Sequence, residues 1–233
     1  MKPQVRIIHR AGTGNMIGRR LGDGTIQITL PAGVDERRAA DAIERMVKRI
    51  EERTPVVTDA EKALFRDGMA VETDYIRFRI SKKGAPANRI IAIRAPDGWT
   101  IAVGEGFEFG HPQTDAGISN VMLRVASAFA PACLLAEAED IARGIGVAPR
   151  CWKVGRGVRT LGSCRSDGSI ILSAAVMFLP HDLREYIVCH ELAHLTEMNH
   201  SAEFHRLCDR YCGGRERELS VRLKNFRWPI IRV

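Results

Sequence analysis

The sequence predicts an α+β fold with a β-rich N-terminal part and a more helical C-terminal part. Polar and apolar residues alternate in several stretches before residue 115, as they do in half-buried strands. Apolar residues then recur at helical spacing over 117–144, and again from residue 182 onward. We therefore expect subdomains at 1–115 and 116–233, with a single continuous domain as the alternative.

The N-terminal part is expected to contain short strands and one helix. Residues 5–30 predict two strands joined by a turn at Asp23-Gly24. Asp35 is a suitable N-cap for a helix that Thr54-Pro55 would stop. Three further strands are expected at Val71–Ile80, Arg89–Arg94 and Trp99–Val103.

The C-terminal part is expected to begin with a long helical segment. This segment covers 117–144 and should break at Pro131, because proline lacks the N–H that a helix interior needs. Strands are predicted at Cys151–Val154 and Ser169–Ser173, separated by a glycine-rich turn at 155–162.

Two more helices are predicted near the C-terminus. The first opens at Pro180, where Asp182 and Glu185 resemble a capping box. The second begins at Ser201, a suitable N-cap, and ends at Gly213-Gly214.

Charge and hydropathy set limits on location and partners. The net charge of +7 is compatible with a nucleic-acid partner but does not require one, because the basic residues are scattered. No apolar run reaches the about 18 residues that a membrane span needs, and the N-terminus does not read as a signal peptide. We therefore expect a cytoplasmic protein that does not bind a membrane. Nothing in the sequence predicts the oligomeric state.

The chain contains six cysteines, at positions 133, 151, 164, 189, 208 and 212. No Cys-x-x-Cys pair is present, so a four-thiolate metal site is not indicated. In a reducing cytosol, free thiols are the expected state.

The most informative motif is His190-Glu191-Leu192-Ala193-His194. Residues four apart share one face of a helix, so the two imidazoles can bind one metal ion. A glutamate next to the first histidine can act as general base on a metal-bound water. Tyr186 lies on the same helical stripe, where packing in the core is the favoured role.

His200 is the favoured third ligand. In an unbroken helix it would lie about 15 Å beyond the first histidine, too far to share the metal. The helix must therefore end near Met198 and reverse at Asn199, a residue type that tolerates a left-handed backbone. Three histidines with an open fourth position are typical of catalytic zinc. The rival third ligands are Glu197, His205 and Asp209.

Several segments around this motif resemble the YgjP-like metal-dependent hydrolases, a family related to the SprT-like and WLM zincin metallopeptidases. The resemblance is carried by residues 190–195, by 199–201 with Phe204, and by 161–164 followed by 168–170. Leu161 replaces the family's tryptophan, and His205 stands where an aromatic residue commonly follows the phenylalanine.

The resemblance implies a zincin-like α/β metallopeptidase core in the C-terminal part. It also implies that His190, His194 and His200 bind zinc and that Glu191 is the base. The strand at 169–173 would pair with an extended peptide.

The leading hypothesis is a zinc-dependent hydrolase, most of all a metallopeptidase that cleaves a peptide or protein. Three alternatives remain open: hydrolysis of a non-peptide bond such as a phosphoanhydride, a nucleic-acid-associated protease, and a non-catalytic zinc-stabilised binding module. Retention of Glu191 argues against the last, because a structural zinc site does not need that carboxylate.

Overall fold

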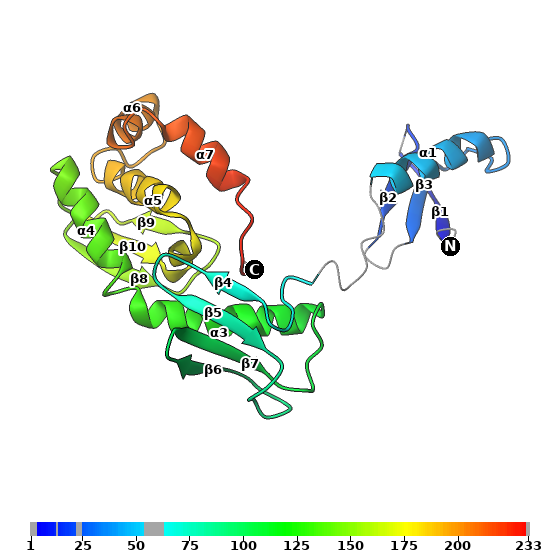
Figure 1. The fold of residues 1–233 in the computed structure, drawn as a ribbon. Coiled ribbons are helices and arrows are strands. Elements are labelled where there is room, and N and C mark those ends of the chain that lie inside the picture. Colours follow the sequence, from blue (N-terminus) through cyan, green and yellow to red (C-terminus); the bar gives the residue numbers. More distant parts are fainter. Residues whose placement is uncertain (1–3, 13, 22–24, 54–62, 232–233) are drawn as a thin grey trace. The chain divides into compact units, whose positions relative to one another are not determined.

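A computed structural model describes residues 4–12, 14–21, 25–53 and 63–231 of the chain. It contains two compact units, Met1–Glu61 and Lys62–Val233, which are considered separately. Within the described residues, helices and three small sheets form the α+β architecture that the sequence predicts (Figure 1).

The first unit is a three-stranded sheet covered by one helix. Its strand order is β1-β3-β2, with β1 parallel and β2 antiparallel to the central β3. The predicted turn at Asp23-Gly24 and the predicted stop at Thr54-Pro55 lie outside the described residues. The elements are β1 (Val5–Arg10), β2 (Ile17–Arg20), β3 (Ile26–Pro31) and α1 (Ala40–Arg53).

Alternation along β3 builds the small core of this unit. Ile26, Ile28 and Leu30 are almost fully buried, whereas the residues between them are half-buried. Ile43 of α1 packs against this row, as the helical spacing of the apolar residues predicts. None of these residues belongs to the core cluster of the second unit.

The second unit begins with a sheet of order β4-β5-β7-β6, in which β5 and β7 are parallel. The single strand expected at 71–80 is in fact two strands. The Thr73 hydroxyl accepts hydrogen bonds from the Tyr75 and Ile76 N–H groups, and this turn interrupts the strand. The strands are β4 (Ala70–Glu72), β5 (Arg77–Ser81), β6 (Ile90–Ala95) and β7 (Gly98–Val103).

Two helices connect this sheet to the next one. The predicted break at Pro131 is confirmed, because α3 (Pro112–Phe129) ends before it and α4 (Leu134–Ile145) begins after it. Helix α3 packs against β6 and β7 (Figure 1) and contains the expected subdomain boundary at residues 115 and 116. The carboxylate of Asp115 accepts a hydrogen bond from the Leu64 N–H, which ties α3 to the start of the second unit.

The last sheet has the order β8-β10-β9, with β10 parallel to β8 and antiparallel to β9. Strand β10 is therefore central, and the expectation that it offers a free edge to a peptide is wrong. The edge next to the metal-motif helix is β9, a strand the sequence did not predict. The strands are β8 (Cys151–Gly155), β9 (Gly162–Cys164) and β10 (Ser169–Ser173).

Helix α5 (His181–Ala193) carries the metal motif and packs against β9, β10 and α4. It is followed by α6 (Ala202–Tyr211), whose predicted start at Ser201 is confirmed: the Ser201 hydroxyl accepts a hydrogen bond from the Phe204 N–H. Helix α7 (Glu216–Lys224), which the sequence did not predict, also contacts α5.

A buried arginine fixes the position of α5. The Arg184 side chain is 2% exposed and forms two hydrogen bonds with the Glu137 carboxylate on α4, at 2.9 and 3.2 Å. It also donates to Asp74 in the β4–β5 turn and to the Leu179 carbonyl, each at 2.7 Å. One side chain thus joins α5 to α4 and to the preceding sheet.

Within the described residues, no single helix is both long and apolar enough to cross a bilayer. Helices α3 and α4 reach that length and composition only as a pair bent by 55°.

Candidate metal centre

The N-terminus of α5 is held differently from the prediction. The N-cap is Pro180, and no side chain caps the helix, so the capping box of Asp182 and Glu185 is wrong. The Asp182 carboxylate accepts a hydrogen bond from the next N–H and forms an ion pair with Arg222 of α7. Asp182 thereby helps to hold α7 beside the metal-motif helix.

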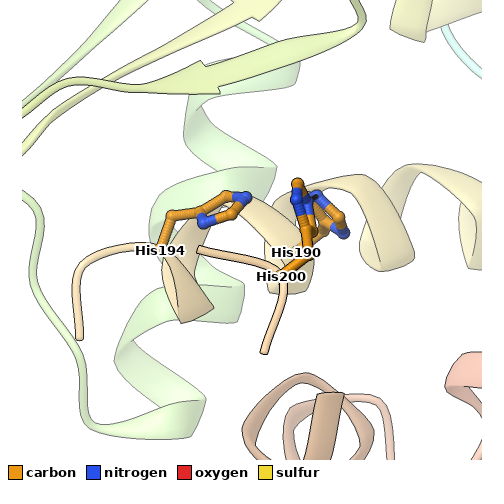
Figure 2. Close-up of side chains that lie close together, drawn as sticks. All are labelled: His190, His194 and His200. Atoms are coloured by element: carbon orange, nitrogen blue, oxygen red, sulfur yellow. Dashed lines mark hydrogen bonds between the residues drawn. The ribbon is translucent and has the colours of Figure 1, made fainter. Parts of the chain in front are cut away.

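Three imidazoles gather at the C-terminal end of α5. His190 comes from the helix, His194 is its C-cap residue, and the following loop brings His200 back beside them (Figure 2). The Nε2 atoms of His190 and His200 are 3.1 Å apart, and one nitrogen from each ring lies within 4.8 Å of the others. Two nitrogens on a tetrahedral zinc ion lie about 3.3 Å apart, for zinc–nitrogen distances of about 2.0–2.1 Å. The donor set therefore fits zinc.

The chain reversal that His200 requires is present, but it is built differently from the prediction. Helix α5 ends at Ala193, before the expected Met198. The N–H groups of Leu195 and Glu197 bond to the carbonyls of Leu192 and Ala193, which forms a compact turn. No described residue other than glycine has a positive φ, so the turn does not use the left-handed backbone that Asn199 would tolerate.

The rings are fixed by neighbouring groups. The Nδ1 atom of His194 lies 2.9 Å from the Glu197 carbonyl oxygen, so this nitrogen donates and Nε2 is left for a metal. The Phe204 ring stacks on His194, at a centroid distance of 4.4 Å, and meets His190 and His200 edge-on. Phe204 is fully buried and forms an apolar base beneath the three histidines.

The rival third ligands make other contacts. Glu197 accepts from His194 through its backbone carbonyl, not through its carboxylate. The Nδ1 atom of His205 is 2.7 Å from a Glu216 carboxylate oxygen, and Asp209 accepts from the Glu216 N–H. Among the described residues, only His190, His194 and His200 form a group with metal-ligand spacing.

Burial favours the neutral imidazole that a metal needs. It lowers the pKa of His190 to about 4, assisted by the adjacent positive charge that His194 and His200 would carry if protonated. Burial also lowers the pKa of His194. Both rings are therefore neutral at pH 7 and can bind a metal without first losing a proton.

Glu191 lies on the face of α5 that meets β9. Its side chain is buried, and the backbone N–H of Cys164 donates to its carboxylate. Burial outweighs this hydrogen bond and raises the Glu191 pKa to about 7. A Cβ atom added at Gly162 would lie only 2.5 Å from Oε1 of Glu191, so glycine is needed at that point of the strand.

A cleft of about 620 Å³ opens beside His190 and Glu191. Tyr186 lines this cleft and is only 6% exposed, with its ring edge-on to that of His190. It therefore packs in the core, as predicted, and also contacts the proposed metal site. The rest of the lining could not be expected from the sequence, which did not predict α7 or the course of the chain after it. This part of the lining is formed by Ser220, Leu223, Lys224, Phe226 and Trp228.

The sequence matches one family of known proteins. The model of the family described as YgjP-like, metallopeptidase domain, matches residues 19–226, which include most of both units. Searches of curated proteins and of solved structures gave no match.

Proposed function

The chain belongs to the YgjP-like metallopeptidase family, and on that premise we propose a zinc-dependent peptidase in which Glu191 is the general base. Family membership makes the protein a metal-dependent peptidase in general. The observation that carries the finer proposal is the group of three histidines beside the buried Glu191 carboxylate.

The choice of zinc rests on the type and number of donors. Three neutral imidazole nitrogens with one position left open are typical of catalytic zinc sites, whereas magnesium and calcium prefer oxygen donors. His190, His194 and His200 would hold the ion. When bound, zinc supplies a Lewis acid that activates water and polarises the scissile carbonyl.

Glu191 would take a proton from the attacking water and deliver it to the departing amine nitrogen. A general base works best when its pKa lies near the working pH, and burial has moved the Glu191 pKa to about 7. The N–H of Cys164 holds the carboxylate in place. Gly162 leaves the space that this carboxylate occupies.

Strand β9 is the natural position for the substrate backbone. Its only partner among the described strands is β10, so its outer edge can form hydrogen bonds with an extended peptide, except at the Cys164 N–H, which is bonded to Glu191. Glu191 packs against the same strand. A peptide bound along β9 would therefore pass close to the proposed base and to the three histidines.

The proposal is tested by comparing wild type with Glu191→Gln, using bound zinc and cleavage of a peptide library as readouts. We expect Glu191→Gln to bind zinc normally and to cleave about 10²–10⁴-fold more slowly, the usual contribution of a general base. Full activity in this variant would contradict the assignment of Glu191.

Parallel assays separate the other functions. A wild type that binds zinc and cleaves no peptide would favour a non-catalytic zinc-stabilised module. Cleavage of nucleotides in place of peptides would favour phosphoanhydride hydrolysis. Salt-dependent DNA binding coupled to proteolysis would favour a nucleic-acid-associated protease.

A further inference from the structure

We propose that the substrate is an acidic peptide, and that Lys224, Arg124 and Arg156 select it by binding its carboxylates near the scissile bond. This inference deepens the proposed peptidase function and rests on it. The charges that line two pockets next to the β8–β9 loop carry the argument.

The first pocket is the cleft beside the histidines. The aromatic rings of Phe226 and Trp228 contribute to its apolar lining, and Lys224 and Arg159 contribute positive charge. Glu191, the proposed base, is the only carboxylate among the described residues that line it. An arriving substrate carboxylate therefore meets cations there, and no acidic side chain other than the base.

The second pocket has a volume of about 590 Å³ and lies between α3 and the β8–β9 loop. Its charged lining residues are Arg124 on the helix and Arg156 on the loop, and no described carboxylate lines it. Asn120 and Ser127 add hydrogen-bonding side chains, and Leu123 and Val158 add apolar surface. This combination suits an acidic side chain with an aliphatic stem.

The β8–β9 loop connects the two pockets. Arg156 and Gly157 of this loop line the second pocket, and Arg159 and Leu161 line the first. The loop is anchored where the Ser173 hydroxyl donates to the Gly157 carbonyl. Because the loop leads directly into β9, an extended peptide on the outer edge of β9 passes next to it, with about 3.3 Å for each residue.

The three selecting cations differ from other basic residues around the site in having no carboxylate partner among the residues that the structure describes. Arg222 forms an ion pair with Asp182, Arg215 with Glu218, and Arg150 with Asp167. Within the part of the chain that the structure describes, Lys224, Arg124 and Arg156 have no carboxylate partner. Their charge is therefore available to a ligand.

The same cations suit a peptide better than a nucleic acid. A phosphate backbone is bound by cations that follow its path along the protein surface. Here the cations are exposed, but each lines a pocket together with apolar side chains such as Leu223, Phe226 and Val158. Pockets of this kind accept side chains one at a time.

The test compares cleavage of matched peptides that carry Glu, Gln or Lys at positions flanking the scissile bond, using the zinc-loaded full chain. We expect kcat/KM to be about tenfold higher for Glu than for Gln, equivalent to about 1.4 kcal/mol. Lys224→Glu and Arg156→Glu should reverse this preference in favour of Lys peptides. Lys83→Glu makes the same charge change at an exposed residue outside both pockets and should leave the preference intact.

Binding is measured separately from turnover in the zinc-loaded Glu191→Gln protein. Acidic peptides should alter the fluorescence of Trp228, which lines the first pocket, and Lys224→Glu should weaken their binding about tenfold. Zinc content and circular dichroism verify that each variant is folded.

The outcomes distinguish the two levels of the proposal. Cleavage with equal kcat/KM for Glu, Gln and Lys peptides overturns the acidic preference and leaves the peptidase function intact. No cleavage of any peptide contradicts the peptidase function, whereas the fluorescence titration still decides whether the pockets bind acidic ligands. Displacement of the acidic peptide by a DNA duplex, with the duplex losing affinity in Lys224→Glu, would overturn the inference in favour of a nucleic-acid ligand.

Discussion

Gly162 of β9 and Glu191 of α5 are in direct contact, so that a Cβ atom at residue 162 would lie 2.5 Å from the Glu191 Oε1 atom. Real Cβ atoms essentially never approach another heavy atom this closely. The edge strand and the proposed base therefore depend on each other: the strand can lie beside the helix only because residue 162 has no side chain. Two residues later, the Cys164 N–H donates to the same carboxylate.

Gly162→Ala is expected to impair catalysis without removing the metal. The added methyl group must displace the Glu191 carboxylate, and a misplacement of about 1 Å can cost about 100-fold in rate. The proposed ligands come from the end of α5 and the loop after it, so zinc content should stay unchanged. Peptide cleavage and zinc content are the measurements.

Gly144→Ala is the matched control for this substitution. Gly144 lies in α4, and nothing stands within 4 Å of a Cβ added there. The change is expected to leave activity intact and to favour the helix slightly, because alanine has a higher helix propensity than glycine. Equal loss of activity in both variants would show that the contact with Glu191 is not the cause.

Glu191→Gln is expected to stabilise the protein after zinc has been removed with a chelator. Burial raises the Glu191 pKa from 4.5 to about 7, so the folded state binds a proton more tightly than the unfolded state does. The ionised carboxylate therefore costs stability above pH 7, by about 3 kcal/mol if each pKa unit represents about 1.4 kcal/mol. Gln carries no charge and avoids this cost.

The stabilisation by Glu191→Gln should depend on pH. The gain in unfolding free energy should be largest near pH 8 and should disappear as the pH falls through 7 and then below 4.5, where Glu191 is protonated in both states. Titration of His190 and His194 affects both proteins, so the difference between them isolates Glu191. Urea unfolding at several pH values measures it, and a difference that does not change with pH would contradict the buried charge as its cause.

His200→Ala and His205→Ala should differ sharply in zinc affinity. His200 places Nε2 3.1 Å from the Nε2 of His190, whereas His205 is bonded to Glu216. Removing a residue that only hydrogen-bonds to a metal ligand typically costs about 10–100-fold in metal affinity. Because His200 is proposed as a ligand itself, we expect its removal to cost at least about 100-fold. His205→Ala should change affinity little. Competition with a chromophoric chelator measures the zinc affinity of both variants. Equal losses of affinity in the two variants would contradict the assignment of His200, rather than His205, as the third ligand.

The main features of the fold could be predicted because local patterns determine them. Helical spacing placed α1 and the helix that bears the motif, and Pro131 marked the break between α3 and α4. Strand β9 and helix α7 were missed for physical reasons. Strand β9 is three residues long and includes a glycine that close packing requires, so it shows no alternation. Helix α7 has a single buried residue, Leu219, and its exposed charges give no apolar stripe.

The residues of the proposed metal site could be predicted from the motif, but their surroundings could not. The spacing of His190 and His194 indicates one helical face, and the distance to His200 requires a reversal. The cleft walls depend on contacts between segments distant in sequence, such as α7 with α5. The order of strands likewise determines that β9, and not β10, is the edge. No local pattern contains this information.

Arg184→Ala is expected to destabilise the protein by about 3–5 kcal/mol, because it leaves the buried Glu137 carboxylate without its arginine and with only the Tyr75 hydroxyl and His181 as partners. Arg206→Ala removes an ion pair with Glu203 in which both side chains are more than half exposed, so it should cost at most about 1 kcal/mol. Urea unfolding of the two variants gives the comparison. Replacing both buried partners, as in Arg184→Met with Glu137→Leu, should recover much of the loss, because no uncompensated charge then remains between α4 and α5. If Arg184→Ala were as mild as Arg206→Ala, this ion pair would not be what holds the metal-motif helix in position.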